Sequence, residues 1–241
     1  MRYLISISYD GSDFYGFERL KNNRSVQGEI EKVLTKIEKA PVEIRGAGRT
    51  DRFVHAFDQK AHFELKQNVP ITRLKKAINS RLPSDIRINE IKIVDDNFHA
   101  RFDCTKKIYK YYINTGKYDI MRNNYLYNYN RKLNIKQMKK AAKYFLGAHS
   151  FKAFCSGERD NYDSIIDRIT IKKNKDVLEF TFIGKSFYRY MVRNMMGAIL
   201  MAGEEKIDPI KIKESLDSET NTIDYATLPA CGLYLMKVDY K

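Results

Sequence analysis

The chain opens with the stretch YLISISYDGS, residues 3–12, which indicates the class of fold. The first seven residues of this stretch alternate between Tyr or Ile on one face and Leu or Ser on the other, which is the period of a strand. The following Asp-Gly-Ser predicts a turn. Apolar residues then recur at helical spacing over 26–37, and Ser25 is the expected N-cap. A strand, a turn and an amphipathic helix in this order are typical of an α+β unit.

Strands and helices continue to alternate along the chain. In the first half we expect strands at 42–46, 61–65 and 86–93, the last interrupted near 89–90, and a helix at 72–82. In the second half we expect strands at 108–114, 165–172, 177–183 and 233–240, a loop at 114–134, and helices at 138–146, 188–201 and from residue 209. The sequence therefore predicts an α+β fold with two ferredoxin/RRM-like halves, residues 1–103 and 104–241. Together they would form one extended mixed, mainly antiparallel sheet, with helices on one face and a central RNA-binding cleft.

The net charge of the chain points to an acidic partner. Its 44 Lys and Arg residues outnumber its 30 Asp and Glu residues, a net charge of +14 over 241 residues. Such an excess repels itself in a compact protein, and binding to a polyanion relieves that repulsion. Nucleic acid is the first candidate and an anionic membrane the second. Lys is spread along the whole chain, so a generally Lys-rich composition explains the positive charge as well as a nucleic-acid partner does.

Several classes of protein are disfavoured by what the sequence lacks. Cys104, Cys155 and Cys231 lie far apart, so we expect no disulfide framework and predict that all three are buried small hydrophobes. The four His residues show no HxH or HxxxH pairing, so we expect no metal. The N-terminus carries no signal-peptide pattern, and no apolar run approaches the roughly 20 residues of a membrane helix. We expect a cytoplasmic protein with no membrane partner.

The stretch RGAGRTD, residues 45–51, is the first candidate for chemistry. It is neither a GxGxxG fingerprint nor a P-loop, because the third glycine and the Gly-Lys-Ser/Thr ending are missing. What it offers is a carboxylate, Asp51, two residues after Arg49 in a loop that can bend at two glycines. Residue types alone favour an exposed Asp in a glycine turn over a catalytic carboxylate.

Two further stretches interleave aromatic side chains with arginines. They are SFYRYMVR at residues 186–193 and FHARF at residues 98–102. Arg pairs with phosphate or carboxylate, and aromatic rings stack on bases. Core aromatics beside solvated arginines would give the same pattern, and the two interpretations are equally supported.

Eight motifs follow one another along nearly the whole chain. They are YDGS with FYGF (9–17), SVQ (25–27), AGRTD with VHA (47–56), NSRLP with DI (79–86), FHARF (98–102), YKY (109–111), MVRN with Gly197 (191–197) and GLYL (232–235). In identity and order they resemble the motifs of the TruA-type tRNA pseudouridine synthases. This resemblance implies an isomerase that converts uridine to pseudouridine in the anticodon stem-loop of tRNA, at positions 38–40. It also implies a homodimer that uses no cofactor and no metal.

By the same resemblance, Asp51 is the catalytic carboxylate. It either attacks the sugar or removes a ribose proton, and the sequence leaves both routes open. Arg193 matches the arginine that pairs with the catalytic Asp. Tyr109 matches the tyrosine that stacks on the target base and takes the proton from C5. Arg49 matches an arginine that helps to displace the base, and Leu233 falls in the strand that walls the pocket.

His99 and Arg101 match positions that contact RNA. The chain also departs from the family pattern, which has glycine where this chain has Phe53 and other residues in place of Arg189 and Tyr190. If the backbone at residue 53 needs a positive φ, Phe53 is strained. Two alternatives therefore stay open: a synthase acting on another tRNA or RNA site, and an inactive RNA-binding protein on the same scaffold.

Overall fold

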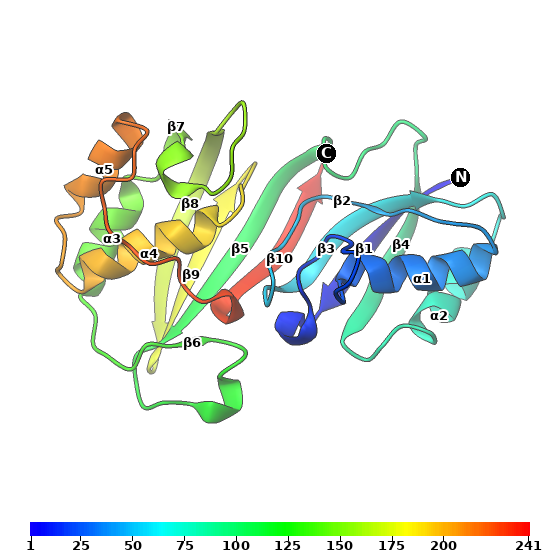
Figure 1. Ribbon diagram of the computed structural model, residues 1–241, viewed down its shortest axis with the longest axis horizontal. Helices are drawn as coiled ribbons and strands as arrows, with labels where there is room; N and C mark the ends of the chain where they lie inside the picture. The colour runs from blue at the N-terminus through cyan, green and yellow to red at the C-terminus, as the bar shows by residue number, and fades with distance from the viewer. The chain divides into compact units, whose positions relative to one another are not determined.

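The computed structural model describes residues 1–241 and groups them into two compact units. The first unit is Met1–Thr105 with Tyr234–Lys241, and the second is Lys106–Leu233. Ten strands and five α-helices give the chain the predicted α+β fold, and the strand pairing is mixed but mainly antiparallel, as expected (Figure 1).

The sheet of the first unit has β1 near its centre. Its strands are β1 (Arg2–Tyr9), β2 (Arg45–Gly46), β3 (His55–Glu64), β4 (Ile86–Val94) and β10 (Leu233–Tyr240). β1 pairs antiparallel with both β3 and β4, the short β2 pairs with β3, and β10 runs parallel to β3. One face of this sheet is covered by α1 (Val26–Glu38) and α2 (Ile71–Asn79) (Figure 1).

The opening stretch folds as its pattern predicts. Tyr3, Ile5 and Ile7 on β1 are fully buried, while the alternate side chains face away from that core. Ser25 caps α1, because its hydroxyl accepts the Gly28 N–H at 3.3 Å. The helix ends at Lys39, which adopts a left-handed conformation with φ of 60°.

Four predictions for the first unit were wrong in extent, and one of them is the helix expected at 72–82, which ends at Asn79. The strand expected at 42–46 is reduced to Arg45–Gly46, because the preceding residues bond to side chains of α1 instead of a neighbouring strand. β3 begins at His55 and not at residue 61. β4 is continuous through 89–90, and the pairing with β1 shifts there to accommodate one extra residue.

The second unit is built on a hairpin and the helices that cover it. Its strands are β5 (Cys104–Asn114), β6 (Tyr127–Asn128), β7 (Gly147–Ser150), β8 (Asp163–Asn174) and β9 (Val177–Gly184), in the order β5-β9-β8-β7 with β6 beside β5. Its helices are α3 (Ile135–Lys143), α4 (Met191–Gly203) and α5 (Ile210–Asp217). Tyr111, Phe180 and Phe182 are fully buried, and α4 is buried along almost its whole length.

The second unit also corrects some element boundaries. The predicted loop 114–134 contains β6 and a 3-10 turn, η2 (Ile120–Arg122), while β7 was not predicted. α3 ends before residue 146. α4 begins at Met191 and not at residue 188, because Tyr190 has a φ of 62° and cannot continue a right-handed helix.

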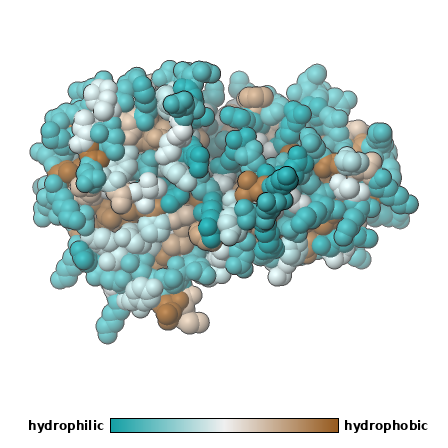
Figure 2. Space-filling model, in the orientation of Figure 1, coloured by the Kyte–Doolittle hydropathy of each residue, from teal (hydrophilic) through white to brown (hydrophobic).

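The visible surface is mostly hydrophilic, with apolar residues in separate patches (Figure 2). One patch lies over η2, where Ile120 is 75% and Met121 84% exposed. No helix has the length and apolarity needed to span a bilayer. The three cysteines form no disulfide; Cys104 is buried as predicted, whereas Cys155 and Cys231 are only half-buried.

Candidate active site

Asp51 lies in a loop of residues 47–54 that connects β2 to β3, and we call this segment the Asp51 loop. Its first half is attached to β3 by two hydrogen bonds. The Ala47 N–H donates to the Lys60 carbonyl at 2.7 Å, and Gln59 Nε2 donates to the Gly48 carbonyl at 3.0 Å. Gln59 is fully buried, so these bonds are shielded from water and anchor the loop to the sheet.

Thr50, the residue before Asp51, is held from two sides. Its carbonyl accepts the Phe17 N–H at 3.1 Å, and its hydroxyl bonds to the Tyr9 hydroxyl at 2.7 Å. Burial raises the pKa of Tyr9 well above its usual value, so the phenol stays neutral and keeps this bond. The backbone next to Asp51 is therefore fixed by groups from β1 and from the segment after it.

Two glycines of the YDGS and FYGF motifs allow that segment to approach the Asp51 loop. A Cβ on Gly11 would lie 2.2 Å from the Val54 carbonyl oxygen, and one on Gly16 would lie 2.8 Å from the Thr50 oxygen. Gly16 also has a φ of 109°, which side chains rarely adopt. The glycines of these two motifs therefore leave room for the close backbone packing around Asp51.

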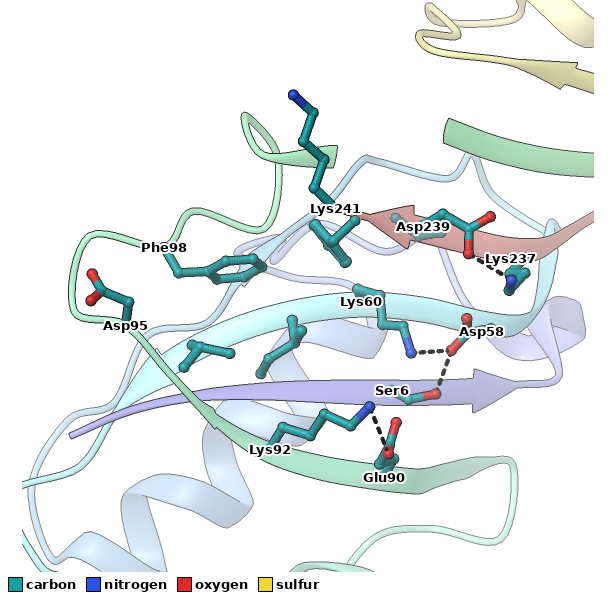
Figure 3. Close-up of a pocket in the computed structure, with 14 residues that line it drawn as sticks. Ser6, Asp58, Lys60, Glu90, Lys92, Asp95, Phe98, Lys237, Asp239 and Lys241 are labelled. Atoms are coloured by element: carbon teal, nitrogen blue, oxygen red, sulfur yellow. Dashed lines mark hydrogen bonds and ion pairs between the residues drawn. The ribbon is translucent and has the colours of Figure 1, made fainter. Parts of the chain in front are cut away.

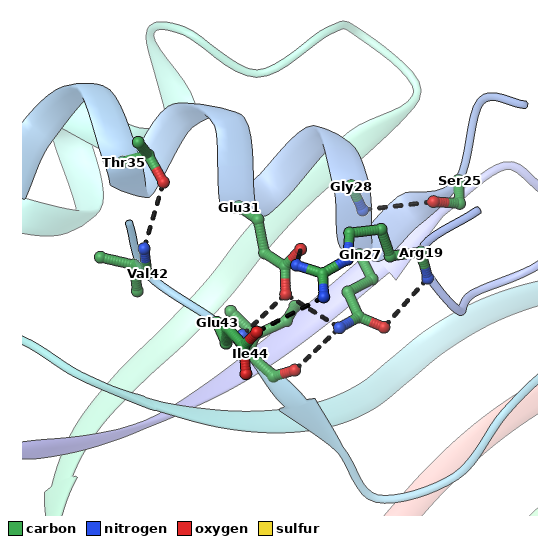
Figure 4. A network of polar contacts seen from close by, with 9 residues as sticks. All are labelled: Arg19, Ser25, Gln27, Gly28, Glu31, Thr35, Val42, Glu43 and Ile44. Carbon is green, nitrogen blue, oxygen red and sulfur yellow. Dashed lines mark hydrogen bonds and ion pairs between the residues drawn. The ribbon is translucent and has the colours of Figure 1, made fainter. Parts of the chain in front are cut away.

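A polar network leads into β2 and the Asp51 loop (Figure 4). The buried Glu31 carboxylate accepts the Ile44 N–H at 3.0 Å and Gln27 Nε2 at 2.8 Å, and it forms a salt bridge with Arg19 at 3.0 Å. Gln27 Nε2 also donates to the Ile44 carbonyl at 3.0 Å. The network ties α1 to the strand-like segment before the loop, and it explains Gln27 of the SVQ motif.

Phe53 has a positive φ, the conformation in which the sequence analysis expects a non-glycine residue to be strained. Its φ is 67°, and the turn is closed by the Val54 N–H donating to the Asp51 carbonyl at 3.2 Å. The Arg52 guanidinium lies 4.2 Å from the Phe53 ring centroid and 4.1 Å from that of Tyr15. The loop thus keeps the path that glycine favours, and cation–π contacts stabilise the larger side chain there.

Arg49 points to solvent beside the loop. Its side chain is 71% exposed and forms a 2.6 Å salt bridge with Glu18, whose side chain is 47% exposed. An exposed pair of this kind contributes about 0–1 kcal/mol, so an anionic ligand can replace Glu18 at little cost.

Within the second unit, Arg193 and Tyr109 occupy defined positions. Arg193 lies in the first turn of α4, its Nε donates to the Leu228 carbonyl at 2.7 Å, and its guanidinium lies 4.9 Å from the Tyr190 ring centroid. Tyr109 lies on β5 opposite Phe182, with its ring edge-on to Phe187 at 5.0 Å. Leu233 is buried at the start of β10.

The site residues predicted from the sequence are thus divided between the units. The first unit holds Asp51, Arg49, His99 and Arg101, and the second holds Tyr109, Arg193 and Leu233. Within the first unit, Asp51 and Arg49 share one loop. His99 and Arg101 belong to a separate turn at the other end of β3, where His62 accepts the Ala100 N–H.

A polar concavity of about 500 Å³ lies on the sheet face of the first unit opposite its helices (Figure 3). Its charged side chains pair with each other: Lys60 with Asp58 at 2.7 Å, Lys92 with Glu90 at 3.0 Å and Lys237 with Asp239 at 2.6 Å. None of the predicted site residues lines it. No three His, Cys, Asp or Glu side chains are grouped so that they could hold a metal ion.

Sequence reasoning missed the polar residues that hold the Asp51 loop, namely Tyr9, Gln59 and Glu31. Strand and helix periodicities place such residues on a buried face but do not show which group each one bonds. The only available signal was a polar residue at a position where the pattern expects an apolar one, as at the fully buried Gln59.

Comparison with known proteins agrees with the motif order. A family model described as tRNA pseudouridine synthase matches residues 5–103 and 141–241. The tRNA pseudouridine synthase A of Bacillus subtilis (strain 168) is 36% identical over 245 residues, covering 100% of this chain and 99% of that protein. The protein of the same name from Thermosipho melanesiensis (strain DSM 12029 / CIP 104789 / BI429) is 40% identical, covering 98% of each chain.

These similarities extend from one end of the chain to the other, and the matched regions include the Asp51 loop, the 98–102 motif and α4. The chain belongs to the tRNA pseudouridine synthase family of isomerases.

Proposed function

We propose that this protein converts uridine to pseudouridine in the anticodon stem-loop of tRNA, at positions 38–40, with Asp51 as its catalytic carboxylate. The observation that carries the proposal is the Asp51 loop itself. Thr50, next to Asp51, is fixed by Tyr9 and Phe17, and the loop is anchored to β3 through Gln59. Catalysis by positioning needs a reacting group that is held in this way.

The reaction is an isomerisation and balances without any other reactant. The bond between N1 of uracil and C1′ of ribose breaks, the base turns, and a bond forms between C5 and C1′. The proton on C5 leaves, and N1 gains a proton. Asp51 either bonds to the sugar in the intermediate or removes a ribose proton, and both routes need an ionised carboxylate at the start.

Arg193 and Tyr109 are the proposed partners of Asp51. A guanidinium near the carboxylate favours its ionised form. The bond from Arg193 Nε to the Leu228 carbonyl would orient the rest of the guanidinium for this role. Tyr109 would stack on the flipped uracil and accept the C5 proton, while Leu233 would form an apolar wall. Arg49 would exchange Glu18 for RNA as the base leaves its stack.

The path of the backbone at Phe53 favours an enzyme over an inactive RNA-binding protein. Loss of the family glycine would be expected to redirect the loop, but Phe53 adopts a φ of 67° and the turn at Asp51 stays closed. As the resemblance implies, the active form would be a homodimer that acts without cofactor or metal. The lack of a signal-peptide pattern in the sequence supports a location in the cytoplasm.

The test of the substrate assignment uses unmodified tRNA transcripts and the purified protein. Pseudouridine is mapped at nucleotide resolution after incubation, and we expect it at positions 38–40 only. A transcript with cytidine at those positions is the matched control and should gain none. Pseudouridine elsewhere in the tRNA would contradict the site assignment, and none in any transcript would contradict the activity.

A further inference from the structure

A column of three aromatic rings rises from the first unit's sheet at the turn between β4 and β5. We call residues 98–103 the Phe102 turn. The ring centroid of His99 lies 4.7 Å from that of His62 on β3 and 4.3 Å from that of Phe102. Phe102 is 73% exposed, which is unusual for a side chain that proteins ordinarily bury. The column therefore presents a free aromatic face to solvent.

The Phe102 turn is held in place on several sides. The Ala100 N–H donates to His62 Nδ1 at 3.1 Å, and the Ala100 carbonyl accepts the Tyr240 hydroxyl at 2.8 Å. The Phe98 carbonyl accepts Arg2 Nη1 at 2.7 Å. A ring presented by a fixed turn loses little conformational freedom when it binds a partner, which favours a binding role.

Two arginines lie beside the column. The Arg101 guanidinium lies 5.8 Å from the Phe102 centroid, and Arg45 lies directly across from His62 in the β2–β3 pair. No carboxylate forms a salt bridge with either arginine. The one acid of the turn, Asp103, accepts the His99 N–H at 2.7 Å.

The two imidazoles keep the column uncharged near neutral pH. Burial, helped by nearby His99 and Arg2, lowers the pKa of His62 to about 4. Burial and the charge of Arg45 also lower the pKa of His99. The column thus combines neutral rings with unpaired guanidinium groups beside them, which is the combination that binds single-stranded nucleic acid.

The neighbouring sheet face lacks this combination. In the concavity of Figure 3, Lys60, Lys92 and Lys237 each pair with a carboxylate, so phosphate would have to displace an acid at every contact. The Phe102 turn needs no such displacement, because Arg45 and Arg101 have no acidic partner.

We propose that Phe102 stacks on an unpaired base of the RNA substrate, and that Arg101 and Arg45 bind the flanking phosphates. The identification of the polymer as RNA rests on the proposed function. His55, next to the Asp51 loop, and His62, beneath the column, are seven residues apart on β3, or about 23 Å at the rise of a strand. One nucleotide cannot reach both, so Phe102 contacts a different nucleotide from the one that Asp51 converts.

The test compares the binding of a tRNA transcript to wild type and to Phe102→Ala, Phe102→Tyr and Ile93→Ala. We expect Phe102→Ala to weaken binding about tenfold, because stacking of one base contributes on the order of 1–3 kcal/mol. Phe102→Tyr keeps an aromatic face and should bind within about twofold of wild type. Ile93→Ala, the matched control, removes a 50% exposed apolar side chain on the outer strand β4 and should leave the affinity unchanged.

Catalysis supplies a second readout. Because the ring acts away from the reacting base, Phe102→Ala should raise KM about tenfold and leave kcat within about twofold. Three results would overturn the proposal. The first is equal affinity of Phe102→Ala and wild type, and the second is weak binding by both Phe102→Ala and Phe102→Tyr. The third is a wild type that does not bind tRNA. A wild type that binds tRNA without making pseudouridine, and loses that binding in Phe102→Ala only, refutes the proposed function and upholds the stacking site.

Discussion

Phe53 stands where the family resemblance implies glycine, and its backbone adopts a positive φ that glycine favours. The position needs a left-handed φ, which costs a non-glycine residue about 1–2 kcal/mol. Here Phe53 meets that need with a φ of 67°, and Arg52 packs against its ring. The sequence predicted strain on the condition that the backbone at this position needs a positive φ, and the backbone angle shows that this condition is met.

The positive φ of Phe53 predicts an unusual order of stability for substitutions at residue 53. In most loops Ala is more stable than Gly by about 0.4–1 kcal/mol. At this position Phe53→Gly relieves the strained φ, whereas Phe53→Ala keeps the strain and loses the cation–π contact. We expect the free energy of unfolding of Phe53→Gly to exceed that of Phe53→Ala by about 1 kcal/mol. Urea denaturation measures both variants, and the ordinary order would show that residue 53 is not strained.

Regular periodicity in the sequence predicted strands and helices well, but it predicted irregular segments poorly. β1, α1 and the β8–β9 hairpin follow their apolar patterns closely. The segment before β2 differs, because its backbone bonds to Glu31 and Thr35 on α1, and no local pattern reports a partner that distant. α4 starts late for a similar reason, since the left-handed Tyr190 breaks a continuous apolar run.

His62, on β3 beneath the Phe102 turn, makes the stability of the fold depend on pH. In the folded protein its pKa is about 4, below the unfolded value of 6.5. Between these values the unfolded chain binds more protons, so acidification favours unfolding. The stability of wild type should therefore fall as the pH drops from about 6.5 towards 4, and the lowered pKa of His99 acts in the same direction.

His62→Asn is the matched variant, because its Oδ1 can still accept the Ala100 N–H but does not titrate. Its stability should fall less than that of wild type when unfolding is measured at pH 7, 5.5 and 4.5 by the same denaturant titration. Equal losses in both proteins would mean that His62 is not the group that couples stability to pH.

For the whole molecule, the sequence predicted the α+β class, the mixed and mainly antiparallel strands, and the family. The ordered motifs indicated the family by resemblance. In the structure, several of their residues lie at close backbone contacts, as at Gly11 and Gly16, or form polar anchors, as at Gln27. The pattern of apolar residues could not predict the hydrogen bonds around Thr50, because these bonds join residues far apart in the sequence.

The net charge of +14 leads to a prediction about tRNA binding by the whole protein. Contacts between Lys or Arg and phosphate release counterions from the RNA, so the affinity depends on salt. Between 50 and 200 mM salt we expect the affinity to fall by roughly two to three powers of ten. The check is a titration of tRNA at several salt concentrations. A dependence close to flat would show that phosphate contacts do not dominate the interface.

Release of tritium from tRNA labelled at C5 of uridine, compared between wild type and Asp51→Asn, tests whether Asp51 is the catalytic residue. Release reports cleavage of the bond at C5, which accompanies each conversion. Asparagine keeps the size of the side chain but removes the carboxylate. We predict that wild type releases tritium, and that Asp51→Asn releases none while it still binds tRNA. Release by Asp51→Asn at a rate close to that of wild type would contradict the assignment of Asp51 as the catalytic residue.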